Sequence, residues 1–265
     1  AMFMAAADDA NVVCVIVKTV QDLKIAFAGD AKDSVDPVRG KRIGIPEWAQ
    51  TASIYTRGWL VHQIGIPLQE IEWVQGGVNG AGRKEKVSLS IPEGVSYTPR
   101  QDKSLTDMLF DGEIDCIMSA HPPTPVEEGE DTIVHLYPNY REVEEQYYRD
   151  TGIFPIMHVI AMRGDFFREN PWVATNLYKA FEEAKNRALF RATEMTATRM
   201  PFAWCYEAAQ KAKDLFGDDF FPYGIEKNRT TLEAFLQYGY EQGTLHKKMK
   251  PEDLFPEEVQ HHFKY

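Results

Sequence analysis

Cysteine is scarce in this chain of 265 residues, and its pattern excludes two common kinds of site. Cys14, Cys116 and Cys205 are odd in number and far apart, so they predict neither a disulfide framework nor a CxxC metal or redox site. A reduced, cytoplasmic setting is the simplest interpretation of this usage. The histidines also lack a ligand spacing such as HxxxH. We therefore expect no metal site.

Long apolar runs and excess positive charge are missing as well. The β-branched run at residues 12–17 is too short to span a membrane, and no basic segment with a cleavage site precedes it. Lys and Arg number 29 against 40 Asp and Glu, which gives a formal charge of −11. This balance argues against nucleic acid or an anionic membrane as the partner. A small anion stays possible, because a few arginines in a cleft outweigh the global sign locally. Self-association is also left open.

Strand and helix signals alternate along the middle of the chain and predict an α/β fold with a mostly parallel sheet. The expected strands are residues 42–46, 71–74, 114–118 and 134–137, and the expected helices are residues 51–65, 104–110 and 140–150. From residue 171 onward the chain is expected to be mostly helical. Asn228 or Thr230 has the chemistry of a helix cap, and residues 251–255 resemble a last docking turn.

The apolar run at residues 151–163 is the most informative stretch of the sequence. Its length and composition predict a buried strand, and His158 lies in its middle. A histidine in such a strand is by default a hydrogen-bonded core residue. The alternative is that His158 faces a ligand cleft, because the preceding turn places it near a crossover between two lobes.

Segments spread over residues 38–256 resemble the 4,5-dihydroxyphthalate decarboxylase family. They are residues 40–48, 56–58, 72–77, 151–158, 177–181, 221–224, 228–229, 231–235 and 251–255. The resemblance implies a type II periplasmic-binding-protein-like fold, with two α/β lobes and a ligand cleft between them. We assign residues 1–40 and 151–265 to a partial, discontinuous lobe one, and residues 41–150 to lobe two.

Two departures from the family pattern stand out. The family's N-terminal stretch, with the first strands of lobe one, has no counterpart here. Residues 21–24 read Gln-Asp-Leu-Lys where the family is expected to have a Phe-Arg-His-Ser-like segment. If that Arg-His pair takes part in the reaction, this chain would bind its ligand without turning it over.

The resemblance implies cofactor-independent decarboxylation of an aromatic dicarboxylate such as 4,5-dihydroxyphthalate. That reaction needs an acid to protonate the ring carbon, a base for the phenol and a cation for the retained carboxylate. A receptor for an aromatic or other small carboxylate is the alternative, and it would place the protein in the periplasm. A weaker alternative is a biosynthetic enzyme of this fold acting on another ring.

Three residues are candidates for the acid–base chemistry. We slightly favour His158 as the proton donor. His121 is the other candidate, because it follows a strand end, where ligands collect in open α/β sheets. It is equally a loop histidine in water. Glu47 could act as the base for the phenol, or be an ordinary acid at a helix start.

Other residues are candidates for binding the ligand. A helix beginning near Thr51 would offer a carboxylate the free N–H groups of Gln50, Thr51, Ala52 and Ser53, or simply be capped there. Arg57 and Arg83 could each hold a carboxylate in a bidentate fork, or lie in solvent. Trp48 and Tyr223 could stack on a ring, but packing in a core explains each of them more simply.

Overall fold

The computed structural model describes residues 16–17, 25–27, 38–129, 133–137, 139–197 and 199–260. The chain divides into two compact units. The helical unit comprises Ala1–Thr19, Tyr148–Glu233 and Met249–Tyr265, and the sheet unit comprises Val20–Tyr147 and Ala234–Lys248. The lobes assigned from the sequence have boundaries at residues 40 and 150, and they differ from these units mainly in giving residues 20–40 and 234–248 to lobe one. Cys14 and residues 21–24 lie outside the described residues.

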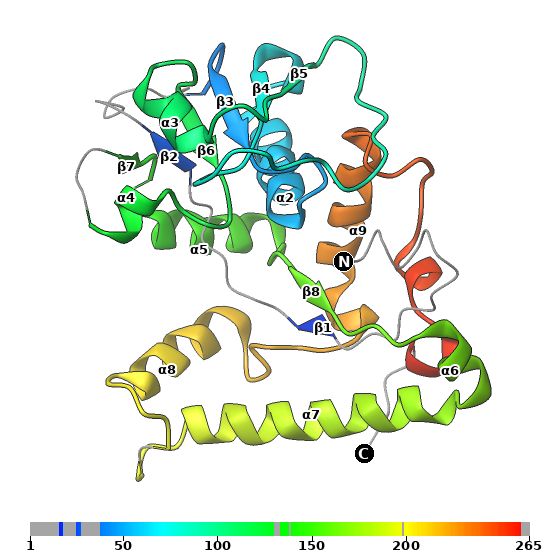
Figure 1. Ribbon diagram of the computed structural model, residues 1–265. Coiled ribbons are helices and arrows are strands. Elements are labelled where there is room, and N and C mark those ends of the chain that lie inside the picture. The colour runs from blue at the N-terminus through cyan, green and yellow to red at the C-terminus, as the bar shows by residue number, and fades with distance from the viewer. Residues whose placement is uncertain are drawn as a thin grey trace. The chain divides into compact units, whose positions relative to one another are not determined.

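The sheet unit is built on six strands in the order β5-β4-β3-β6-β2-β7 (Figure 1). Their bounds are β2 Ile25–Phe27, β3 Arg42–Ile45, β4 Glu72–Gln75, β5 Ser96–Pro99, β6 Cys116–Met118 and β7 Val134–His135. Strand β3 runs parallel to β4 and β6, and β4 runs parallel to β5. Strand β2 is antiparallel to both of its neighbours. The expected α/β class is confirmed.

The three helices predicted at residues 51–65, 104–110 and 140–150 begin and end close to those positions. Helix α2 (Thr51–Trp59) continues as a π turn to Ile64 and stops at Gly65, whose φ of 78° suits glycine. Helix α3 (Leu105–Phe110) is capped by Ser104, which accepts a hydrogen bond from the Asp107 amide. Helices α4 (Thr124–Glu127) and α5 (Tyr140–Thr151) follow. The apolar face of α3 packs against β6, where burying each large side chain stabilises the unit by roughly 1.5–3 kcal/mol.

The helical unit contains a two-stranded antiparallel sheet, β1 (Ile16–Val17) with β8 (His158–Val159). Its helices are α6 (Gly164–Glu169), α7 (Trp172–Ala192), α8 (Cys205–Phe216) and the first part of α9 (Ile225–Glu241). Short 3₁₀ turns follow at Pro251–Leu254 and Glu257–Val259. Tyr178, Leu232 and Phe255 meet in its core, so the predicted docking turn at residues 251–255 is confirmed.

Two local predictions were wrong. The apolar run at residues 151–163 does not form a long buried strand, since only His158 and Val159 pair as β8, and His158 is exposed. Ile156, from the same run, is buried in the core of the helical unit instead of in a sheet. Neither Asn228 nor Thr230 begins a helix: α9 starts at Ile225, directly after Gly224, whose φ is 90°. The Asn228 amide holds this segment by donating to the carbonyls of Pro222 and Gly224.

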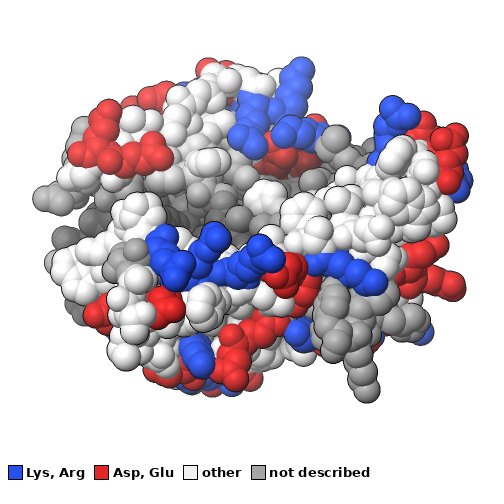
Figure 2. All heavy atoms as spheres, turned by 90° about the horizontal axis from the view of Figure 1, so that it is seen from below, with Lys and Arg blue, Asp and Glu red and all other residues white. Residues whose placement is uncertain are grey.

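The negative net charge is not spread evenly over the surface. On the face seen from below, Lys and Arg side chains form a row, with Asp and Glu around it (Figure 2). Within the residues that the structure describes, no helix combines the length and apolarity needed to cross a membrane.

Candidate functional site

A cavity of about 770 Å³ lies in the sheet unit, at the edge where three neighbouring parallel strands end. Pro46 and Glu47 follow β3, Gly77 and Val78 follow β4, and Ser119 and His121 follow β6; all of them line the cavity. Gln50 and residues 79–86 complete the lining. The carboxyl edge of parallel strands is where open α/β sheets bind their ligands. The sheet topology therefore makes this cavity the candidate site.

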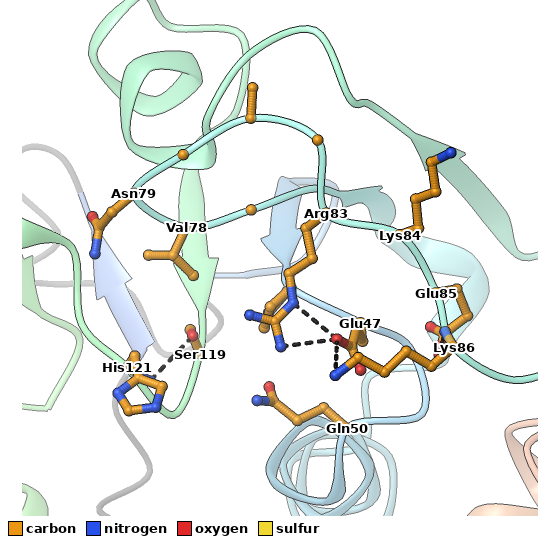
Figure 3. A pocket seen from close by; sticks show the side chains of 15 residues that line it. Glu47, Gln50, Val78, Asn79, Arg83, Lys84, Glu85, Lys86, Ser119 and His121 are labelled. Carbon is orange, nitrogen blue, oxygen red and sulfur yellow. Dashed lines mark hydrogen bonds and ion pairs between the residues drawn. The ribbon is translucent and has the colours of Figure 1, made fainter.

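One wall of the cavity carries a cluster of charged side chains (Figure 3). The Nε and Nη2 atoms of Arg83 lie 2.9 and 2.8 Å from Oε1 of Glu47, and Nζ of Lys86 lies 3.2 Å from the same oxygen. The Glu47 side chain is only 9% exposed, whereas those of Arg83 and Lys86 are 37% and 63% exposed. Two cations thus share one partly enclosed carboxylate, and both remain accessible from the cavity.

The glycine-rich loop holds Arg83 in place. A Cβ at Gly77 would lie 1.9 Å from the carbonyl oxygen of Gly80, so the loop closes on itself only with glycine there. The buried Gln75 side chain donates to the carbonyls of Pro46 and Arg83, at 2.8 and 3.1 Å. These bonds join the loop after β4 to the loop after β3, which carries Glu47.

The opposite wall carries His121, held by Asn79 and Ser119 (Figure 3). Asn79 donates to the Pro122 carbonyl at 3.2 Å and accepts from the Thr124 amide at 2.9 Å. The His121 amide donates to the Ser119 hydroxyl at 3.2 Å. The backbone beside His121 is therefore fixed while its imidazole remains exposed to the cavity.

The start of α2 contributes less than the sequence suggested. Of its four predicted residues only Gln50 lines the cavity; Thr51, Ala52 and Ser53 do not. The amides of Trp48 and Ala49, just before the helix, already have a carboxylate partner within the chain. Oε2 of Glu85 accepts from them at 2.6 and 3.3 Å.

Arg57 is placed in the interior of the sheet unit and not in the cavity lining. Its guanidinium lies 3.9 Å from the ring centroid of Trp48, and it donates to Gln242 Oε1 and to the Trp48 carbonyl. Burial lowers the pKa of Arg57 to about 9, although the charge of Glu85 opposes this shift, so the group is still charged at neutral pH. Because Arg57 is fully buried, its side chain is not accessible from the cavity.

The remaining predicted residues are not part of the cavity lining. Trp48 is fully buried and makes edge contacts with Trp73 and Tyr97, as the packing alternative expected. Tyr223 is buried in the core of the helical unit, and burial raises the pKa of its phenol. His158 belongs to the same unit, on β8.

Sequence reasoning missed several residues that line the cavity. Ser119 directly follows β6, so the strand-end argument that selected His121 would have found it. Asn79 and Lys86 carry no comparable signal, because only the folding of the glycine-rich loop brings them to the cavity. In the described part of the chain, no group of three His, Cys, Asp or Glu side chains is placed to hold a metal ion. Burial raises the pKa of the Cys116 thiol, which disfavours a thiolate at neutral pH.

Comparison with known sequences gave two informative similarities. The chain is 32% identical over 219 residues to a protein of Comamonas testosteroni named 4,5-dihydroxyphthalate decarboxylase. The aligned region covers 82% of this chain and 66% of that protein. It is 30% identical over 118 residues to a Pseudomonas putida protein of the same name, covering 44% and 46%. The chain thus spans about two thirds of the first relative and less than half of the second. No protein-family model matches it.

Among solved structures, the similarity is weaker. The periplasmic aliphatic sulphonate binding protein SsuA of Escherichia coli gives a TM-score of 0.47 at 12% identity, over all of this chain and 75% of that one. The alkanesulfonate-binding protein SsuA of Xanthomonas axonopodis pv. citri, bound to MOPS, gives 0.43 at 12% identity, over 98% and 74%. Scores this low say nothing about the ligand of this chain.

Proposed function

Because this chain belongs to the 4,5-dihydroxyphthalate decarboxylase family, we propose that it removes carbon dioxide from an aromatic dicarboxylate such as 4,5-dihydroxyphthalate. The sequence similarity to a protein of that name, over 82% of the chain, supports this reaction class most directly. The cavity at the strand ends supports it independently, because it combines cations, a carboxylate and an imidazole. These are the groups that a cofactor-free decarboxylation of an arene requires.

In the proposed reaction, Arg83 and Lys86 hold the carboxylate that the product retains. The imidazolium of His121 gives its proton to the ring carbon that bears the other carboxylate, while Glu47 accepts the proton of the para hydroxyl. The bond to the carboxylate then breaks, carbon dioxide leaves, and the bonding electron pair restores the aromatic ring. Glu47 then returns its proton to the phenolate, and His121 takes up a proton from solvent, so that the reaction consumes one proton in total. We prefer His121 to His158 as the donor because His121 lines the cavity.

The test is carbon dioxide release from 4,5-dihydroxyphthalate by the wild type, His121→Asn and His158→Asn, with calorimetric binding of phthalate measured in parallel. Loss of a general acid typically lowers the rate by roughly 10²–10⁴-fold, so His121→Asn is expected to lose turnover and keep its affinity within a few fold. His158→Asn serves as the matched control and is expected to retain turnover.

Other outcomes would redirect the assignment. Turnover lost only in His158→Asn would move the proton donor to the helical unit. Phthalate binding by the wild type without any carbon dioxide release would contradict the enzyme proposal and favour a carboxylate receptor.

A further inference from the structure

Val78 gives the cavity an apolar surface among its polar and charged side chains. It follows β4, lines the cavity and is 7% exposed. The remainder of its side chain packs in the apolar cluster that includes Leu105 and Ile117. In the view of Figure 3, the Val78 side chain lies between those of His121 and Arg83, which line the same cavity. An apolar group thus lies within the part of the cavity where the proposed reaction takes place.

The backbone at Val78 is held firmly by the first turn of α3. The amide and the hydroxyl of Thr106 both donate to the Val78 carbonyl, at 3.0 and 2.8 Å. The Leu105 amide donates to the preceding carbonyl, that of Gly77, at 2.8 Å. Because the Val78 carbonyl already accepts two hydrogen bonds and a β-branched side chain has few rotamers, Val78 presents fixed methyl groups to the cavity instead of a free carbonyl oxygen.

The position of Val78 also connects it with the proposed proton donor. Asn79, the next residue, is hydrogen-bonded to the loop that carries His121. Pro46, another apolar residue of the lining, instead directly precedes Glu47 on the opposite wall. In the proposed reaction, the ring carbon that takes the proton from His121 also bears the leaving carboxylate. That carboxylate therefore belongs on the side of the cavity where Val78 lies.

We propose that the leaving carboxylate is held against Val78, whose methyl groups accelerate the loss of carbon dioxide by keeping water and hydrogen-bond donors away from it. This inference rests on the proposed function and adds the residue that contacts the departing group, while Arg83 and Lys86 hold the retained carboxylate. The leaving carboxylate is charged in the bound substrate and becomes neutral carbon dioxide, because the electron pair of the broken bond stays with the ring. An apolar contact therefore disfavours the bound substrate more than the transition state.

The experiment measures kcat and KM for carbon dioxide release from 4,5-dihydroxyphthalate by the wild type and Val78→Thr. Threonine has nearly the shape of valine, but it places a hydroxyl beside the leaving carboxylate. A hydrogen bond from this hydroxyl stabilises the charged carboxylate and is lost as carbon dioxide forms. We expect kcat and KM to fall together by about fivefold, so that kcat/KM stays nearly unchanged. Val78→Ala, which opens room for water beside the carboxylate, is expected to lower kcat by about threefold.

Binding probes and a control variant separate this effect from damage to the fold. By calorimetry, Val78→Thr is expected to bind phthalate about fivefold more tightly than the wild type does. Its affinity for benzoate should not change, because benzoate has no second carboxylate to meet the hydroxyl. Val74→Thr makes the same substitution at a residue that packs against the same apolar cluster but is not in the lining. This control is expected to leave kcat, KM and both affinities unchanged.

Three results would overturn the inference. A lower kcat with an unchanged or higher KM, together with weaker phthalate binding by Val78→Thr, would show that Val78 only packs in the core. Wild-type turnover with an unchanged kcat in both Val78 variants would overturn the inference alone and leave the proposed reaction standing. Absence of carbon dioxide release by the wild type would overturn the proposed function, and the inference with it.

Discussion

The sheet unit and the helical unit each contain a cluster of opposite charges, and the two clusters differ in burial. Lys86 of the sheet unit is 63% exposed beside Glu47, whereas Lys185 of the helical unit is 3% exposed beside Glu182. Nζ of Lys185 lies 2.7 Å from Oε1 of Glu182 and 2.8 Å from Oδ1 of Asp219. The same atom lies 5.2 Å from the ring centroid of Tyr223. Similar ion pairs thus lie at an open cavity in one unit and inside packed helices in the other.

The difference shows how burial separates a charge that is enclosed by the fold from one that a ligand can reach. Burial alone would raise the pKa of Asp219, but hydrogen bonds from Lys185 and Lys227 lower it overall. The charges of this cluster are therefore paired with one another. At the strand ends, the cations stay exposed and can exchange one partner for another.

The largest expected effect comes from Lys185→Met. Removing one member of a buried ion pair leaves the other charge enclosed without a partner, so we expect a loss of about 3 kcal/mol in the free energy of unfolding. Lys86→Met, at the exposed pair, should cost less than about 0.5 kcal/mol. Urea unfolding of both variants measures the contrast. Equal losses in the free energy of unfolding for the two variants would show that burial does not distinguish the two clusters.

A smaller effect on stability, but a clear one on binding, is expected for Gly77→Ala. The added Cβ would collide with the Gly80 carbonyl, so the loop must open and displace Arg83. We expect phthalate affinity to fall at least fivefold, with a stability loss of roughly 1–2 kcal/mol. Gly80→Ala is the matched control, because a Cβ there meets no atom within 4 Å. Loss of affinity in both variants would mean that the loop's shape does not set the site.

The smallest expected effect lies at the amino ends of the strands, opposite the ends that line the cavity. Arg42 is the first residue of β3, and Asp115 directly precedes β6. Arg42 donates to both carboxylate oxygens of Asp115, at 2.8 and 3.0 Å, and lowers the pKa of that carboxyl. The stabilisation is therefore present above the ordinary pKa near 3.8 and is lost as pH falls through the lower folded value. Since the pair is about one third exposed, Asp115→Asn should cost only about 0.5–1 kcal/mol at pH 7.

Unfolding of wild type and Asp115→Asn as a function of pH checks this prediction. The difference in the free energy of unfolding between the two proteins should disappear at acidic pH, where the carboxyl of Asp115 in the wild type is also protonated. A difference that stays constant down to pH values below the folded pKa would show that geometry, and not charge, makes this contribution.

Local patterns predicted most of the elements of the sheet unit. The helix predicted at residues 51–65 does stop at Gly65, and the helix predicted at residues 104–110 is capped by Ser104, because these roles depend on backbone conformation and on hydrogen bonds to near neighbours. Local patterns failed where the partner was distant. The run around His158 has strand composition, yet β1 pairs with only two of its residues. Another apolar side chain of the run, Ile156, packs in the core of the helical unit instead of in a sheet.

For the candidate site, the sequence by itself determined the α/β class, the family and four cavity residues, Glu47, Gln50, Arg83 and His121, because strand ends, a helix start and a glycine-rich loop are visible in short stretches. Only the tertiary structure decided that these residues share one cavity and that Arg57 does not. Their sequence separation reaches 74 residues, and parallel pairing of β4, β3 and β6 brings them together. Arg57 lies near Glu47 in sequence, but the rotation of α2 and its packing against Trp48 and Gln242 bury it.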